Sequence, residues 1–196
     1  PDYVSGISPF FSDFARVEAA IFSKAKAARL EREKHYDDRI QGRIEKIISK
    51  YYTGLDEKND VRIPKWILAE SKKYGYDPLF LTALIITESS FYNWAKSSKG
   101  ARGLMQLRPA TAVALASETR LKWSGTRTLF DPEKNIALGA YYLNKLVSRF
   151  GDLSLALEAY NHGPSRLNRY LRKGYQPERY SKKVLKNYRK IRFQPI

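Results

Sequence analysis

Helix start and stop signals recur along this chain and constrain its fold more than any other feature of the sequence. Asp77-Pro78 and Asp131-Pro132 each pair a capping acid with a proline suited to the first helical position. Gly75 and Gly151 stand where helices would end. No long strand-type alternation of apolar and polar residues interrupts these signals. The sequence therefore predicts an all-α, compact and non-repeating fold.

The same signals divide the chain into expected helices and loops. At 196 residues it is long enough for one domain with an extension. Residues 8–50 read as one long helix or two, and residues 53–60, 92–103 and 119–130 read as breaks or irregular connections. Shorter helices are expected at residues 63–74, 78–88, 109–117, 132–150, 153–161, 165–173 and 178–191.

Two apolar stripes in the N-terminal segment flank a stretch of mostly Ala, Arg, Lys and Glu that has little to bury. We expect residues 1–55 to form a helical extension and residues 56–196 to form the main domain. A brace packed on that domain is the favoured interpretation, because such stripes are typical of a core, and a docking arm for a partner is the alternative. The stripes comprise Phe10, Phe14, Val17 and Ile21, then Ile40, Ile44, Ile47, Ile48 and Tyr51.

Positive charge dominates the chain. It carries 36 Lys and Arg against 20 Asp and Glu, a formal net charge of +16. This balance predicts an anionic partner, which could be peptidoglycan with its peptide carboxylates, a membrane surface or nucleic acid. Residues 166–192 concentrate eleven basic side chains beside one acid, with tyrosines interleaved. Because no helix-turn-helix glycine pattern or zinc ligand set accompanies them, nucleic acid ranks below the other anionic partners, and we do not expect it.

The residue types that the chain lacks limit its chemistry. Cysteine is absent, which excludes disulfides, a thiol nucleophile and thiolate metal sites. Only His35 and His162 could add imidazole ligands, so we expect no metal and no cofactor. No run of about 18 apolar residues exists, so we expect no membrane span. The chain begins PDYV, without methionine or an apolar signal core, and we expect that a targeting segment was removed.

Glu88 is the strongest candidate for a catalytic residue. It follows the apolar run from Leu79 to Ile86 and continues the helical face of Leu81, Leu84 and Ile85. A carboxyl group at the end of such a face is desolvated, which raises its pKa and lets it donate a proton near neutral pH. The alternative is that Glu88 begins the solvated end of a core helix, and the shared face favours the functional interpretation.

Three ordered motifs resemble the soluble lytic transglycosylase (SLT, family 1) domain. They are Glu88-Ser89, then the run from Gly103 to Gln106, then Ala159-Tyr160-Asn161. Ser97 and a Gly-Ala pair fall between the first two motifs, as in that family. The resemblance covers roughly residues 61–190. It implies a goose-lysozyme-like (SLT) helical catalytic domain within residues 56–196.

The resemblance also implies a reaction. No second carboxylate matches a lysozyme-like pair, since Asp131 and Asp152 already read as caps and Glu158 lies on a helix. In the family a single Glu, here Glu88, protonates the glycosidic oxygen after MurNAc. The same Glu then acts as base on the C6 hydroxyl of that sugar. The product is a 1,6-anhydro sugar, formed without water.

The resemblance assigns substrate contacts to matching positions: Ser97, Gly103, Met105, Gln106, Tyr160, Asn161 and Tyr180. Tyr180 is expected to point its hydroxyl at Glu88. Two departures alter the pattern. His162 stands where the family commonly has a small residue. The family often shows a Glu-Thr pair that begins four residues before the tyrosine matched here by Tyr180. This chain has Gln176-Pro177 in place of that pair, so we expect the mouth of the cleft to differ there.

Three functions from different classes follow from these observations. A peptidoglycan lytic transglycosylase leads, and a hydrolytic muramidase on the same fold is the second. The third is a non-catalytic helical protein that binds glycan or nucleic acid. For the leading function we expect glycan strands of peptidoglycan as the partner, a periplasmic or cell-envelope location, peripheral association with the envelope or membrane, and a monomer.

Overall fold

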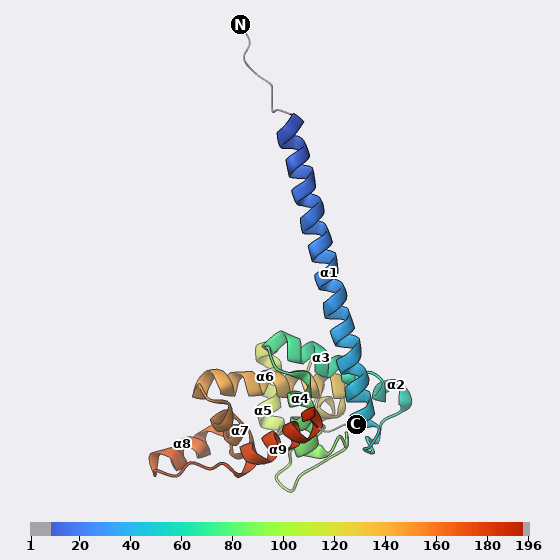
Figure 1. The fold of residues 1–196 in the computed structure, drawn as a ribbon. Helices are drawn as coiled ribbons and strands as arrows, with labels where there is room; N and C mark the ends of the chain where they lie inside the picture. Colours follow the sequence, from blue (N-terminus) through green and yellow to red (C-terminus); the bar gives the residue numbers. More distant parts are fainter. Residues whose placement is uncertain (1–8, 194–196) are drawn as a thin grey trace. The chain divides into compact units, whose positions relative to one another are not determined.

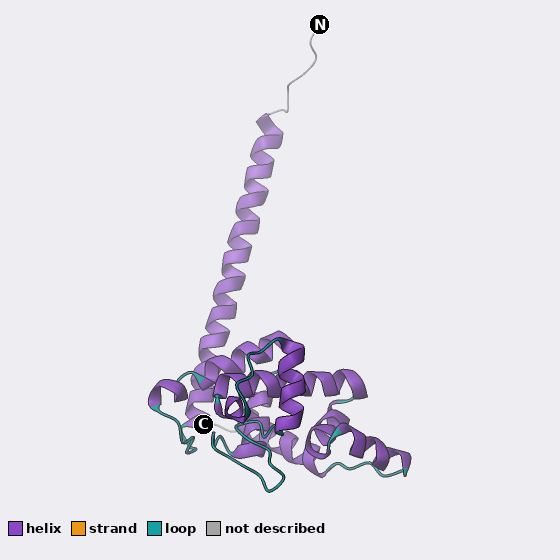
Figure 2. Ribbon diagram, turned by 180° about the vertical axis from the view of Figure 1, so that it is seen from behind, coloured by secondary structure: helices purple, strands orange, loops and turns teal. Residues whose placement is uncertain are grey.

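Helices make up nearly all the regular structure of the chain, as the capping signals predict. The computed structural model describes residues 9–193, with side chains from residue 16 onward. Within this part no strand forms, and only isolated bridges join Arg102 to Lys96 and to Leu107 (Figure 2). The helices are α1 (Pro9–Ile48), α2 (Glu57–Asp60), α3 (Ile63–Tyr74), α4 (Pro78–Ser89), α5 (Pro109–Thr119), η1 (Thr126–Phe130), α6 (Pro132–Phe150), α7 (Leu153–His162), α8 (Pro164–Arg172) and α9 (Arg179–Phe193) (Figure 1).

The predicted caps form as hydrogen bonds. The side chain of Asp77 accepts from the backbone N–H of Leu79, and that of Asp152 accepts from Leu155. Gly75 ends α3 with φ of 72°, a left-handed conformation that glycine adopts without a Cβ penalty. One expectation was incomplete. The break at residues 53–60 contains the short helix α2, because Asp56 caps it by accepting from Asn59.

The chain divides into two compact units between Arg39 and Ile40. The described part of the first unit is the run of α1 up to Arg39, whose Val17 and Ile21 side chains are 57% and 63% exposed. A single helix offers them no core of its own, so the predicted brace stays a prediction. Phe10 and Phe14 of that stripe lie outside the described side chains.

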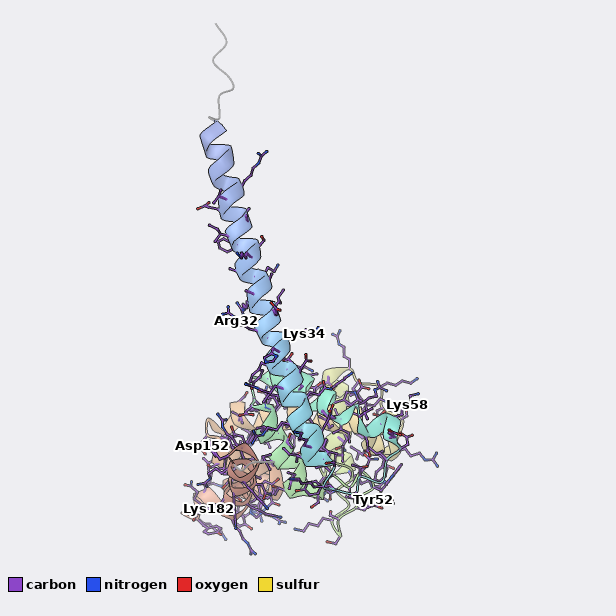
Figure 3. The ribbon with its side chains drawn as sticks, turned by 45° about the vertical axis from the view of Figure 1, so that its right-hand side comes forward. Arg32, Lys34, Tyr52, Lys58, Asp152 and Lys182 are labelled. Carbon is purple, nitrogen blue, oxygen red and sulfur yellow. The ribbon has the colours of Figure 1, made fainter. Side chains whose placement is uncertain are left out.

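The second unit is built around α4. Every side chain of α4 from Pro78 to Ile85 is buried, and helices α3 and α9 pack against it. The last turns of α1 add Ile44 and Ile47 to the same core. Charged side chains such as Lys58, Asp152 and Lys182 lie at the periphery of this unit (Figure 3). Among residues 9–193, no helix combines the length and the apolar character needed to cross a membrane.

Candidate active site

Helix α4 positions Glu88 by burying everything before it. Leu81, Leu84 and Ile85 are fully buried on the face that Glu88 continues, and the Glu88 side chain itself is half-buried. The backbone turns directly afterwards, because Ser90 and Phe91 both adopt positive φ. Glu88 therefore stands where the apolar helix leaves the core.

Burial makes Glu88 a weak acid. It raises the pKa of this carboxyl from 4.5 to about 7, in agreement with the sequence expectation. Two contacts from α9 act in the opposite direction. The Tyr180 hydroxyl donates to Glu88 Oε1, as expected from the sequence, and the positive charge of Lys183 also favours the carboxylate. Burial and the nearby Glu88 in turn raise the pKa of Tyr180 well above its ordinary value.

Gly103 opens the turn of the second motif for a steric reason. Its φ is 80°, and a Cβ there would lie 2.1 Å from the Leu129 carbonyl oxygen and 2.3 Å from Asn135 Nδ2. The buried Asn135 accepts from the N–H of Met105 at 2.7 Å and donates to the Leu129 carbonyl at 2.9 Å. Asn135 was not singled out from the sequence, because nothing in its local pattern distinguishes it on α6.

The three motifs converge on this turn. Ser89 Oγ at the end of α4 donates to the Leu104 carbonyl at 2.8 Å. The buried Tyr160 hydroxyl on α7 donates to the Met105 carbonyl at 2.9 Å. Burial raises the pKa of Tyr160 well above its ordinary value, and the charge of Glu88 raises it further. The fold thus brings together motifs that lie far apart in the sequence.

Other candidate residues divide into exposed and buried positions. Asn161 is exposed and lines a cavity of about 180 Å³ with Tyr160, Gln106 and His162. Gln106 donates its amide N–H groups to the carbonyls of Ala95 and Gly103, so that side chain also holds the loop. These positions do not test whether any of the residues contacts a substrate, so each assigned substrate contact stays a prediction.

Ser97 and Met105 both stabilise the structure around the second motif. The exposed Ser97 accepts at Oγ from the N–H of Ala101 at 3.0 Å, which closes the loop between the motifs. The Met105 side chain is fully buried, and it fills the space above Gly139, where a Cβ would meet its sulfur at 2.4 Å. Its backbone carbonyl accepts the hydrogen bond from Tyr160 of the third motif.

Glu158 is a buried acid whose role the sequence did not reveal. Its Oε1 accepts from the N–H of Ser181 at 2.8 Å and from Ser181 Oγ at 2.9 Å. His162 Nε2 lies 3.5 Å from its other oxygen. One signal was available, since an acid amid the apolar residues of α7 implies a buried partner. No group of three or more His, Asp and Glu within residues 9–193 is arranged to hold a metal ion.

Comparisons with known proteins agree with this geometry. The model of the transglycosylase SLT domain family matches residues 65–183. The transglycosylase of Enterobacteria phage PRD1 is 38% identical over 119 residues, covering 61% of this chain and 40% of the phage protein. A membrane-bound lytic murein transglycosylase F of Desulfosudis oleivorans is 31% identical over 160 residues, covering 70% of this chain and 33% of that protein.

A solved structure shows the same fold. The 70 kDa soluble lytic transglycosylase of Escherichia coli aligns with a TM-score of 0.60 and 27% identity, over 66% of this chain and 24% of that one. The chain therefore spans well under half the length of each of these relatives. The all-α, lysozyme-like fold expected from the sequence is confirmed.

Proposed function

Because the chain belongs to the transglycosylase SLT domain family, we propose that it cleaves peptidoglycan as a lytic transglycosylase. The bond is the β-1,4 linkage between MurNAc and GlcNAc, and the product ends in 1,6-anhydroMurNAc. One observation carries the proposal. Glu88 is half-buried at the end of α4, its pKa is about 7, and Tyr180 bonds to it.

Glu88 supplies both proton transfers. In its protonated form it donates to the glycosidic oxygen, so that the C1–O bond of MurNAc breaks and GlcNAc leaves with the proton as its hydroxyl. The resulting carboxylate then takes the proton of the MurNAc C6 hydroxyl as that oxygen bonds to C1. The proton returns to Glu88 and no water is consumed. A pKa of about 7 suits this cycle, because both forms are populated near neutral pH.

Two residues of helix α9 lower the pKa of Glu88. The Tyr180 hydrogen bond and the Lys183 charge both stabilise the carboxylate form, which opposes the effect of burial. Without them the group would give up its proton less readily in the first step. For sugar contacts we propose the residues around the cavity of about 180 Å³, which include Gln106, Tyr160 and Asn161. The exposed Ser97 is proposed to touch the substrate directly, whereas the buried Gly103 and Met105 are proposed to contribute by shaping the turn beside it.

The setting follows from the same family membership and from charge. We propose that the protein acts as a monomer on glycan strands, in the periplasm or the cell envelope. Its formal charge of +16 favours an anionic polymer as substrate.

Mass spectrometry of digested sacculi tests the function. Wild-type protein should release 1,6-anhydroMurNAc ends, and Glu88→Gln should lose about 10²–10⁴-fold in rate because a general acid and base is missing. The matched control is Glu57→Gln, which changes an exposed glutamate on α2 and should keep full activity. Reducing-end MurNAc, heavier by one water, would identify a muramidase instead. Undiminished release by a folded Glu88→Gln variant would contradict a catalytic Glu88.

A further inference from the structure

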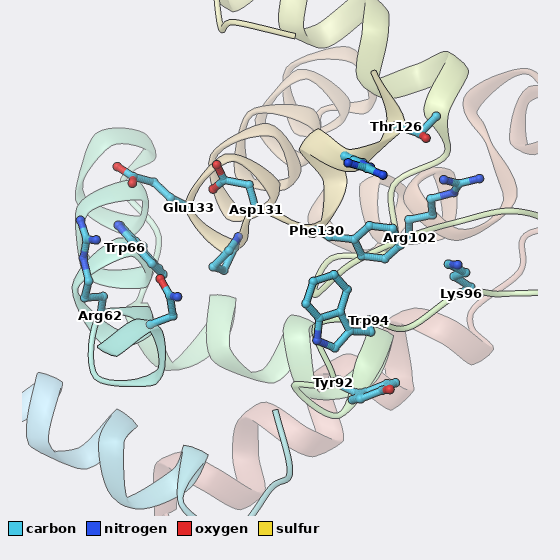
Figure 4. Close-up of a pocket in the computed structure, with 13 residues that line it drawn as sticks. Arg62, Trp66, Tyr92, Trp94, Lys96, Arg102, Thr126, Phe130, Asp131 and Glu133 are labelled. Carbon is cyan, nitrogen blue, oxygen red and sulfur yellow. The ribbon is translucent and has the colours of Figure 1, made fainter. Parts of the chain in front are cut away.

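A second and larger cavity lies outside the candidate active site. It measures about 1130 Å³ and opens between the start of α3, the loop after α4, and the η1–α6 junction (Figure 4). It shares no lining residue with the cavity beside Tyr160 and Asn161, and Glu88 and Tyr180 line neither cavity. We call it the aromatic groove and define it by six lining residues: Arg62, Trp66, Trp94, Lys96, Arg102 and Phe130.

Trp94 and Tyr92 present exposed rings in this groove, whereas Arg62 lies 5.0 Å from the ring centroid of Trp66 and Lys96 Nζ lies 5.5 Å from that of Phe130. Trp94 is 47% exposed, although its Nε1 donates to the Gly54 carbonyl at 2.8 Å and its ring centroid lies 5.3 Å from that of Phe130. Gly54 leaves room for that ring, since a Cβ there would lie 2.8 Å from Trp94 Cδ1. Tyr92, 40% exposed, stacks on Tyr52. Ordered aromatic faces with satisfied polar edges suit the apolar face of a sugar ring.

Charge in the groove is divided between its two ends. Figure 4 shows Lys96 and Arg102 at one end and Arg62, Asp131 and Glu133 at the other, with Trp94 and Phe130 between them. Asp131 is already engaged, because it caps α6 and its Oδ2 lies 2.6 Å from Lys134 Nζ. The end at Lys96 and Arg102 is positive because both acidic lining residues, Asp131 and Glu133, lie at the other end (Figure 4), and it fits a ligand carboxylate.

We propose that the aromatic groove is a second, non-catalytic site for peptidoglycan. The rings would take a sugar of the glycan strand, and the Lys96 and Arg102 end would take a carboxylate of its stem peptide. The volume of about 1130 Å³ lies just above the usual range for small-molecule sites, so it leaves room for part of a polymer. This inference rests on the proposed function, because it takes the substrate class from it.

The backbone ties this groove to the candidate active site. Arg102 pairs with Lys96 and with Leu107 across the loop, and Gly103 follows it directly. Asn135 donates to the Arg102 carbonyl at 3.2 Å and accepts from Met105. The loop of residues 96–107 therefore carries both the groove residues Lys96 and Arg102 and the turn from Gly103 to Gln106 in the candidate active site. A glycan strand bound in the groove would keep the enzyme on the polymer between cleavage events without occupying the candidate active site.

Binding to sacculi tests the proposal, with the full chain in its inactive Glu88→Gln form. Trp94→Ala and Lys96→Gln should each weaken co-sedimentation with purified sacculi about tenfold. Matched controls are Tyr175→Ala and Lys122→Gln, which remove an exposed aromatic ring and an exposed lysine outside the groove. In the active form, Trp94→Ala and Lys96→Gln should slow the cleavage of sacculi more than that of a short soluble glycan fragment, because Glu88 and Tyr180 do not line the groove.

Three results would overturn the groove as a glycan site. They are unchanged sacculus binding in both groove variants, equal losses in the controls, and groove-dependent capture of an acidic protein without any effect on sacculi. Lys96→Gln keeps every ring in place, so it remains informative if Trp94→Ala is unstable. The two proposals fail separately. Absence of anhydro products from wild type would refute the transglycosylase function, whereas normal products with unaffected binding would refute only the groove.

Discussion

At the scale of single residues, the burial of Glu88 raises its pKa and lowers the stability of the folded protein at neutral and higher pH. Its pKa is about 7 in the folded protein against 4.5 when exposed, so between these values the folded state binds the proton that the unfolded state has released. Stability from this group is full below pH 4.5 and is lost as pH rises through 7. The loss above that range amounts to about 3 kcal/mol.

The prediction for Glu88→Gln follows from this sign. A neutral amide has no proton to lose, so the variant should gain stability relative to wild type as pH rises. We expect the difference in unfolding free energy to change by about 3 kcal/mol in favour of Gln between pH 4 and pH 8. Urea unfolding at both pH values measures it. An equal difference at both pH values would mean that folding does not shift the pKa of Glu88.

Residue-scale features differed in how far the sequence could predict them. The desolvation of Glu88 was predictable from the sequence, because it comes from neighbours on the same helix, such as Leu84 and Ile85. Glu158 was not, because its partner Ser181 lies on α9 and the register of α9 against α7 is set by tertiary packing. Asn135 was missed for the same reason, since it bonds to segments 30 and 6 residues away.

At the scale of elements, the turn from Gly103 to Gln106 depends on glycine for space as well as for backbone conformation. Gly100 and Gly103 have nearly the same φ, 78° and 80°, but a Cβ meets nothing within 4 Å at Gly100 and meets the Leu129 carbonyl at 2.1 Å at Gly103. Gly100→Ala should cost only the left-handed strain, about 1 kcal/mol. Gly103→Ala should cost about 1–3 kcal/mol more in urea unfolding, because the backbone of η1 must move. Equal losses would show that the turn relaxes freely.

The contact between α7 and α9 is a cap made across the tertiary structure. Ser181 lies in the first turn of α9, where N–H groups have no partner within the helix, and Glu158 of α7 accepts from it. Glu158→Ala should destabilise the protein by about 1–3 kcal/mol, because a buried N–H and hydroxyl lose their acceptor. Glu158→Gln keeps a carbonyl oxygen there and should recover part of that loss.

The same helix carries Tyr180 and Lys183, so this cap also positions the groups that lower the pKa of Glu88. Glu158→Ala should therefore move the alkaline limb of the kcat/KM profile to higher pH, and Tyr180→Phe should do the same by removing the hydrogen bond directly. Glu158→Gln should leave the limb near its wild-type position. A role in stability alone would lower the amount of folded enzyme and leave the limb in place.

Helix boundaries were the most predictable elements. Asp77, Asp131 and Asp152 cap where their sequence context indicated, because each acts on a backbone N–H two or three residues later. The helix α2 was missed because four residues carry no periodicity. The aromatic groove was also missed, since Trp66, Trp94 and Phe130 meet only after α3, the loop after α4 and η1 have packed.

At the scale of the whole molecule, the core of the second unit includes residues from the segment that the sequence analysis assigned to the N-terminal extension. Ile44 and Ile47 enter the core of the second unit, so that unit begins at Ile40 by its internal contacts, whereas the sequence divided the chain after residue 55. The stripe of isoleucines was visible in the sequence, and the brace interpretation placed it against the main domain, where Ile44 and Ile47 lie in the core. The division into extension and catalytic domain stays a prediction about independent folding.

Net charge belongs to the molecule as a whole, and it leads to a prediction about salt. With a formal charge of +16, the protein should be drawn to sacculi by many exposed charges, which salt screens. The screening length falls from about 10 Å at 0.1 M to about 3 Å at 1 M, so cleavage of intact sacculi should slow markedly over that range. Glu88 is half-buried, so the chemical step itself should respond less.

Glycan strands freed of their stem peptides provide the matched substrate, because they carry fewer carboxylates per sugar. Their cleavage should fall less steeply with salt than that of intact sacculi, with sucrose at equal osmolarity as the control for water activity. The steeper dependence for intact sacculi should appear in KM rather than kcat, since screening weakens encounter and binding. Parallel salt curves for the two substrates would instead place the salt effect in the folded enzyme and leave the basic surface without a part in substrate capture.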